Sequence, residues 1–137
     1  MKTGLKFKKV YWDDHLTEIY IEVTAKNIWT NITYYSDIKL SSFNELSILI
    51  KNFIENLKPF EWGDGDDNFN IKVYPLDKLG HIQIDFSLKN AETGYLDGHR
   101  YCECSLMFEL GKIEKLGKHI LNFIDNNDYS IEIEAMD

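Results

Sequence analysis

A five-residue pattern, Asn-Phe-Ile-acid-Asn, occurs twice in the sequence, at residues 52–56 and 122–126. Each copy ends a segment with the apolar spacing of an amphipathic helix, and each helix follows two segments that alternate like β-strands. The strand segments that begin at Ile21 and Ile84 also resemble each other. We therefore predict two strand-strand-helix units, and the second is longer by seven residues between strand and helix.

Alternation of apolar and polar residues predicts the strands. They cover residues 5–12, 18–25, 28–38, 69–74, 81–88 and 100–110, and residues 129–135 are either a last strand or a frayed tail. A phase shift at Lys8 and Lys9 predicts a bulge in the first strand. We predict an α+β fold in a single domain of 137 residues. Its largely antiparallel sheet has about six strands, and two helices pack on one face.

The two helices are predicted at about 42–57 and 112–125. Ser42 and Glu45 have the spacing of a capping box, in which each side chain bonds the backbone amide of the other residue. Pro59 follows the first helix and prevents its continuation.

Residues 60–68 are predicted to form a loop, because they combine glycines with a high density of acids. The acids are Asp64, Asp66 and Asp67. They do not fit a calcium loop, whose twelfth position would fall on Pro75, so no metal site is predicted. Trp62 either anchors an interface beside these acids or packs back under the loop.

The formal net charge is −8, from 23 acidic and 15 basic residues. Binding to nucleic acid needs clustered Lys and Arg, so this charge argues against a nucleic-acid-binding protein and favours a basic protein partner. No apolar run reaches membrane-spanning length and no signal-peptide pattern follows Met1, so we expect a cytoplasmic protein without membrane contact. Cys102 and Cys104 fall on the core side of one strand and are expected to be free, buried thiols.

The sequence contains no nucleophile elbow, glycine-rich phosphate loop or zinc-ligand spacing, so we predict neither catalysis nor a cofactor. One alternative stays open. His81, Asp97 and His99 lie in or next to predicted turns and could converge in the pocket of a small-ligand-binding module or an enzyme.

Acids and tyrosines share the predicted polar faces of the strands. They are Glu22, Asp85, Glu103, Glu109, Glu132 and Glu134, with Tyr20, Tyr74 and Tyr101. Such a face is either a solvated sheet surface or a binding site for a basic protein, where acids speed association and tyrosines supply contact area. The predicted partner-binding residues are Trp62, Asp64, Asp66, Asp67, Asp97, Tyr101 and Glu103.

Two hydrophobic patterns match the plan of a known protein family. The C-terminal half carries Gly80-His81-Ile82-Gln83-Ile84, then Ser105-Leu106-Met107-Phe108-Glu109-Leu110, then Leu116 and Ile120 on the last helix. The N-terminal half carries Trp29, a strand through Ile38, and Phe43, Leu46 and Phe53 on a helix. Over about residues 18–125 the sequence resembles the WapI-type immunity proteins and related small bacterial proteins, and residues 129–137 extend beyond that pattern.

The resemblance implies a cytoplasmic immunity protein that binds and blocks the toxic domain of a bacterial toxin, as in contact-dependent inhibition. Such toxins are frequently nucleases with basic surfaces, which an acidic inhibitor complements. The inhibitor would act by occlusion, as a monomer or weak dimer, and no catalytic residue is carried over from the family. The alternatives are the pocket described above and an interaction domain without a toxin partner.

Overall fold

The computed structural model describes most of the chain. The described residues are 3–12, 17–25, 30–37, 40–63, 69–89, 101–124 and 130–136. Their side chains are described at 3–8, 22–24, 42–63, 69–87, 103–123 and 130–136.

The described strands form two four-stranded sheets in which all neighbouring strands are antiparallel. Sheet A has the order β3-β2-β1-β8, with β1 at Gly4–Trp12, β2 at Thr17–Ala25, β3 at Thr30–Asp37 and β8 at Ser130–Glu134. Sheet B has the order β4-β5-β6-β7, with β4 at Phe60–Gly63, β5 at Phe69–Pro75, β6 at His81–Lys89 and β7 at Tyr101–Glu109. The helices are α1 at Leu40–Asn56 and α2 at Leu110–Ile124.

The α+β class and the antiparallel pairing are confirmed, but the prediction of a single sheet is wrong. The described residues form eight strands that divide between two sheets, and the open question about residues 129–135 is answered by strand β8. The strand that the prediction lacks is β4, in the stretch predicted as a loop. Phe60, Glu61 and Trp62 do alternate, but a run this short is hard to distinguish from the glycines and acids that follow it.

The two predicted strand-strand-helix units are present as β2-β3-α1 and β6-β7-α2. The strand after each helix joins the sheet of the other unit: β4 follows α1 but pairs with β5, and β8 follows α2 but pairs with β1. Sheet B therefore consists of four consecutive strands, whereas sheet A combines the first three strands with β8 from the C-terminal end. Sheet A is not complete until β8 is in place.

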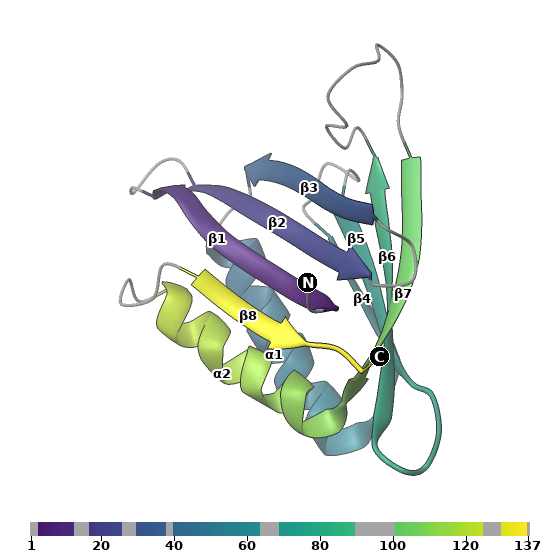
Figure 1. The fold of residues 1–137 in the computed structure, drawn as a ribbon. Helices are drawn as coiled ribbons and strands as arrows, with labels where there is room; N and C mark the ends of the chain where they lie inside the picture. Colours follow the sequence, from purple (N-terminus) through teal and green to yellow (C-terminus); the bar gives the residue numbers. More distant parts are fainter. Residues whose placement is uncertain are drawn as a thin grey trace.

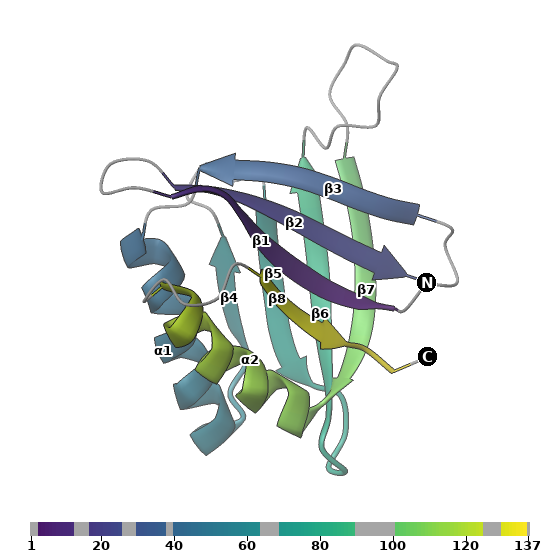
Figure 2. The same cartoon turned by 60° about the vertical axis from the view of Figure 1, so that its left-hand side comes forward.

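The two sheets face each other, and the helices lie side by side along one flank (Figures 1 and 2). α2 packs beside β8, an edge strand of sheet A, and α1 packs beside β4, an edge strand of sheet B. The helix pair therefore connects the edges of two sheets, instead of covering one face of a single sheet as predicted.

Apolar side chains from both sheets and both helices form one core. Phe43 of α1 is fully buried and contacts every layer. The centroid of its ring lies 5.6 Å from that of Phe7 in sheet A, 6.2 Å from that of Trp62 in sheet B, and 5.3 Å from that of Phe123 in α2. These rings meet edge-to-face or tilted, which are the favourable arrangements for aromatic pairs.

Local contacts near the start of α1 differ from the prediction. The prediction of a capping box at Ser42 is wrong, because α1 already begins at Leu40 and Ser42 lies inside the helix. The Ser42 carbonyl instead accepts a hydrogen bond of 2.8 Å from the indole Nε1–H of Trp62.

The predicted bulge in β1 is confirmed by a register shift between Lys9 and Tyr11.

The C-terminal segment links the two sheets. After β8, the Ala135 amide donates to the Thr3 carbonyl at 2.8 Å, and the Met136 amide donates to the Met107 carbonyl at 2.7 Å. Thr3 precedes β1 of sheet A, whereas Met107 lies on β7 of sheet B. The segment therefore crosses from one sheet to the edge of the other, where Figure 1 shows the C-terminus beside β7.

Replacing Phe43 by Ala should lower the free energy of unfolding by about 3–5 kcal/mol, because the lost ring contacts both sheets and α2. Ile48→Ala on the same helix is the control, since Ile48 is 51% exposed and its truncation should cost only about 1 kcal/mol. Urea denaturation followed by circular dichroism measures both values. Equal losses in the two variants would contradict a special role for Phe43.

Two glycines of α2 should respond in opposite ways to replacement by alanine. A Cβ at Gly117 would lie 2.8 Å from Cγ2 of Ile50 on α1, whereas a Cβ at Gly111 would have open space. Alanine favours a helix by about 1 kcal/mol over glycine, so Gly111→Ala should be neutral or stabilising. Gly117→Ala should destabilise by about 1–3 kcal/mol, because Ile50 is buried and its branched side chain is stiff. Thermal unfolding measures the difference, and stabilisation by both changes would show that the helices separate easily.

Candidate functional site

The outer face of sheet B is polar because its strands alternate. Inward side chains such as Phe69, Ile71 and Val73 of β5 are buried, and the side chains between them point away from the core. Among the described side chains, the outer face consists of Glu61, Asn70, Lys72, Tyr74, His81, Gln83, Asp85, Ser87, Glu103, Ser105, Met107 and Glu109.

Asp85 is the centre of a hydrogen-bond network on this face. Its Oδ1 accepts hydrogen bonds from Ser105 Oγ at 2.6 Å and from Gln83 Nε2 at 2.8 Å. Its Oδ2 accepts a hydrogen bond from the Tyr74 hydroxyl at 3.0 Å, and Gln83 Nε2 also donates to that hydroxyl at 2.6 Å. The register brings these residues together, because Asp85 lies opposite Ser105 and Gln83 lies opposite Tyr74.

The network sets the charges on this face. Partial burial pushes the pKa of Asp85 upward, but hydrogen bonds from Gln83, Ser105 and Tyr74, with the nearby charge of Lys72, outweigh it and hold the pKa below its ordinary value. Partial desolvation, followed by the hydrogen bond to Asp85 and its negative charge, raises the pKa of Tyr74. At neutral pH the site therefore contains a fixed carboxylate beside a neutral phenol.

A hollow of about 410 Å³ lies at one side of the network and is lined by Asp85 and Ser105. The polar side chains around it include Glu61, Asn70, Lys72, Asp85, Glu103 and Ser105. Three carboxylates and one amine leave this hollow with an excess of negative charge. Such an arrangement suits cationic groups that also donate hydrogen bonds, as Lys and Arg side chains do.

One predicted partner-binding residue, Glu103, lies exposed on this face. Tyr101 begins β7, but its side chain lies outside those described. The other predicted acids lie outside the described residues: Asp64, Asp66, Asp67 and Asp97.

The strand ends next to these acids share one end of sheet B. Gly63, which precedes Asp64 in the sequence, pairs with Asn70. Asn70 pairs with Ser87, and Lys89 pairs with Tyr101. Both segments that contain predicted partner-binding acids therefore connect to the same end of the sheet.

Trp62 is not available to anchor an interface. Its side chain is only 5% exposed, and its ring packs against Phe43 and Phe69, with centroid distances of 6.2 and 6.1 Å. Of the two predicted interpretations, the structure shows inward packing. The indole N–H is satisfied by the Ser42 carbonyl, as expected for a buried tryptophan.

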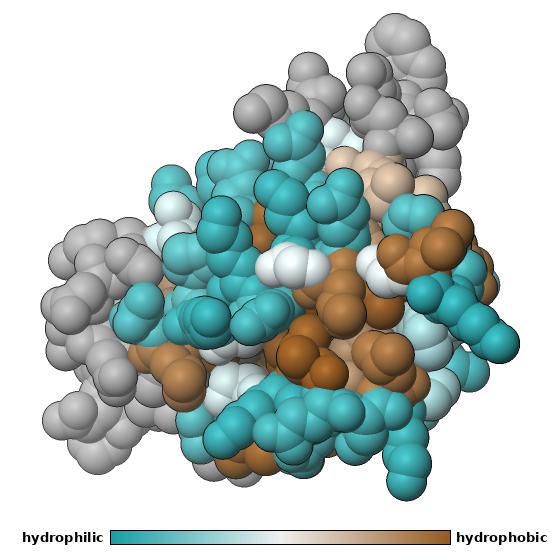
Figure 3. All heavy atoms as spheres, turned by 90° about the horizontal axis from the view of Figure 1, so that it is seen from below, coloured by the Kyte–Doolittle hydropathy of each residue, from teal (hydrophilic) through white to brown (hydrophobic). Residues whose placement is uncertain are grey.

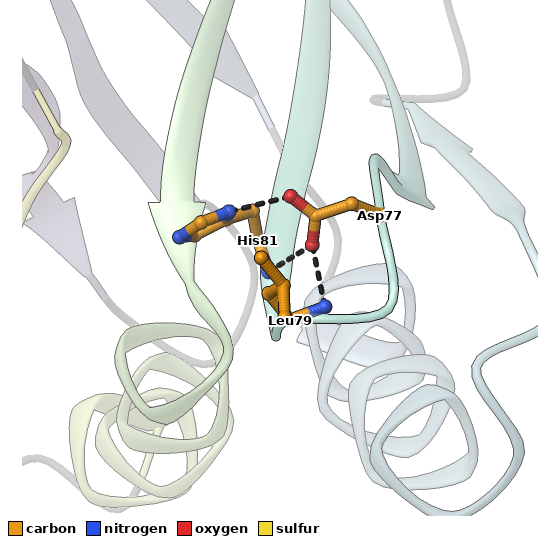
Figure 4. A network of polar contacts seen from close by, with 3 residues as sticks. All are labelled: Asp77, Leu79 and His81. Atoms are coloured by element: carbon orange, nitrogen blue, oxygen red, sulfur yellow. Dashed lines mark hydrogen bonds and ion pairs between the residues drawn. The ribbon is translucent and has the colours of Figure 1, made fainter.

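His81 is the first residue of β6 and contacts Asp77 in the turn between β5 and β6 (Figure 4). Its Nδ1 is 2.6 Å from Asp77 Oδ2, and Asp77 Oδ1 accepts hydrogen bonds from the backbone amides of Leu79 and His81 at 2.7 and 3.3 Å. The side-chain hydrogen bond from His81 is the main cause that lowers the pKa of Asp77. These contacts fix the shape of the turn.

The alternative pocket of His81, Asp97 and His99 stays a prediction, because Asp97 and His99 lie outside the described residues. His81 begins β6, whereas Lys89 ends it and pairs with Tyr101, the first described residue after His99.

A second candidate surface lies between the two helices. A groove of about 520 Å³ includes Ile48 and Leu121, which are 51% and 48% exposed. Figure 3 views the molecule from the end where the helices lie in Figure 1, and hydrophobic residues gather there between hydrophilic ones. Both charges occur around the groove, on Lys51, Glu55, Glu114 and Lys118. The groove therefore favours no partner of one charge sign.

Sequence reasoning missed Glu61 and the pairing that builds the network. Glu61 lies in the stretch predicted as a loop, and only the alternation of Phe60, Glu61 and Trp62 hints at a strand. Asp85 and Ser105 are 20 residues apart, so their contact depends on strand register.

The comparisons with known proteins give no match to a family model, a curated protein or a solved structure. The resemblance to the WapI-type immunity proteins stays a prediction. Within the described ranges, no three His, Cys, Asp or Glu side chains come together in a way that could hold a metal ion. The described helices are also too short or too polar to span a bilayer.

Asp85→Asn should destabilise the protein by about 1–2 kcal/mol at neutral pH, because it removes the charge that the network stabilises. The pKa of Asp85 is lowered on folding, so this stability is present above the ordinary carboxyl pKa near 4 and is lost as the pH falls through the folded-state pKa. The difference between wild type and variant should therefore shrink in acid, as measured by urea denaturation between about pH 2 and 7.

Glu109→Gln is the matched control, because it removes an exposed carboxylate from the same face and should change stability by less than about 0.5 kcal/mol. A difference between wild type and Asp85→Asn that stays constant down to about pH 2 would contradict the role of the Asp85 charge.

Proposed function

We propose that the chain is an immunity protein that binds a basic toxin domain through the outer face of sheet B and neutralises it by occlusion. The observation that carries the proposal is the cluster of carboxylates on a rigid sheet. Among the described side chains, Glu61, Asp85, Glu103 and Glu109 share this face with one amine, that of Lys72. The formal charge of −8 adds long-range attraction toward a basic partner.

The outer face of sheet A carries a smaller excess of negative charge among the described side chains. Glu22, Glu132 and Glu134 share it with two amines, those of Lys6 and Lys8. The larger excess of carboxylates on sheet B favours that sheet as the side that faces a basic protein.

Rigidity is the second property that suits the outer face of sheet B to binding. Asp85 accepts hydrogen bonds from three side chains, so its position is fixed before a partner arrives. Fixed side chains lose little conformational entropy on association. Tyr74 adds a ring beside the carboxylate, and tyrosines contribute much of the contact area in protein interfaces.

In this proposal the chain performs no chemistry. A nuclease toxin needs basic residues to hold the phosphates of its substrate, and a row of carboxylates can bind the same basic residues in place of the phosphates. The inhibitor would act in the cytoplasm of the cell that makes it, before the toxin reaches nucleic acid.

Co-expression with the toxin domain encoded next to this chain tests the proposed function. We expect the cells to survive and the two proteins to purify together. Cell death without co-purification would contradict the proposal.

Two variants that lose the same number of charges test whether binding depends on the outer face of sheet B. The changes are Glu61→Gln, Glu103→Gln and Glu109→Gln in sheet B, and Glu22→Gln, Glu132→Gln and Glu134→Gln in sheet A. Both remove three negative charges, but only the sheet B variant should slow association with the toxin domain by about tenfold at low salt. Stopped-flow fluorescence at two salt concentrations measures the rates. Equal slowing by both variants would show that net charge matters and the face does not.

A further inference from the structure

The edge of sheet B at β7 is a second feature that bears on binding. β7 is the last strand of its sheet and pairs with β6 on one side. Figures 1 and 2 show it at the outer margin of the sheet. On the other side of β7, the Met136 amide donates a hydrogen bond to the Met107 carbonyl. The edge thus already accepts one extended segment.

Two hydrogen bonds establish the direction of the backbone groups of β7. The Leu110 amide donates to the Gly80 carbonyl next to β6, whereas the Met107 carbonyl accepts from Met136 on the opposite side. Backbone groups alternate between the two sides of an antiparallel strand. Even-numbered residues of β7 therefore bond to β6, and odd-numbered residues, Ser105 among them, direct their N–H and C=O toward the edge.

Ser105 is the described position where an added strand would begin. Its side chain bonds to Asp85 on the outer face, but no described residue bonds its backbone at the edge. An edge with such groups is a template for an extended chain. The register between β6 and β7 is regular along the whole pair, so the alternation of backbone groups holds along β7 without a bulge.

The outer face determines which side chains an added strand should carry. Residues that lie opposite each other in antiparallel strands point to the same face, so the residue opposite Ser105 would point to the outer face of sheet B. It would lie two strands from Asp85, at about 10 Å between backbones. A Lys or Arg side chain is long enough to reach over Ser105 to that carboxylate. Alternate positions of the strand would meet the same acidic face.

We propose that an extended segment of the basic partner adds to the β7 edge as a strand, beginning at Ser105, with Lys or Arg at alternate positions. The inference rests on the proposed function for the identity of the partner, but the edge itself can be tested with a peptide. Backbone hydrogen bonds would supply part of the affinity, and the alternate cations would select the acidic face.

The test uses an eight-residue peptide that alternates Lys and Val and a fluorescent label at one end. We compare Ser105→Pro with Ser105→Ala. Both lose the hydroxyl that bonds Asp85, but only proline also loses the N–H at the edge. Proline is tolerated at edge positions whose N–H faces away from the sheet, and circular dichroism checks the fold. Fluorescence anisotropy should show about tenfold weaker binding to Ser105→Pro than to Ser105→Ala.

A second arm leaves the protein unchanged. Two peptides are N-methylated at every second residue, one at the odd positions and one at the even positions. In one of them the lost N–H groups are those that face β7, and in the other they are those that face away. The first peptide should bind about tenfold more weakly, and the second should bind as the unmodified peptide does. A peptide of the same composition with its lysines grouped at one end should also bind more weakly. Equal binding of all these peptides, or no saturable binding by the alternating peptide, would overturn the inference.

The two proposals fail in distinguishable ways. A toxin domain that binds wild type and Ser105→Pro equally would contradict the added strand but leave the proposed function intact. A peptide that pairs with the β7 edge, when no basic toxin domain binds any variant, would support the edge and contradict the proposed function.

Discussion

Contacts of the Phe43 ring hold the layers of this protein together. One buried ring meets Phe7 of sheet A, Trp62 of sheet B and Phe123 of α2. The helices can connect the edges of two sheets only if such a side chain fills the space where all the layers meet, because protein interiors tolerate few voids. Strand β8 strengthens this arrangement, since it ties the C-terminal end of the chain into sheet A.

This core leaves the outer faces of the sheets for other roles. Among the described side chains, the acids of sheet A share their face with Lys6 and Lys8, whereas those of sheet B share theirs with Lys72. The hydrogen bonds to Asp85 hold its charge and position together, since the interactions that lower its pKa also fix the carboxylate. The β7 edge lies beside this face, so one surface combines fixed negative charge with a template for an extended chain.

The alternation of apolar and polar residues predicts which side chains of a strand are buried, but it does not predict which strands become neighbours. Ile82, Ile84 and Phe86 are buried as their spacing predicts, because side chains of a strand point to opposite faces with a period of two. The same spacing results whether the strands belong to one sheet or to two, which is why the prediction of a single sheet failed. The capping box failed for a related reason: residues before Ser42 entered the helix, and tertiary contacts decide where a helix begins.

The sequence by itself determined the net charge, the strand-strand-helix order and the position of Glu103 and Asp85 opposite the core. Only the tertiary structure decided that Asp85 lies opposite Ser105, that Glu61 joins the same face and that Trp62 is buried. The reason is physical. Burial within a strand follows from local periodicity, whereas register and sheet membership depend on contacts between distant segments, which form only when the whole core is assembled.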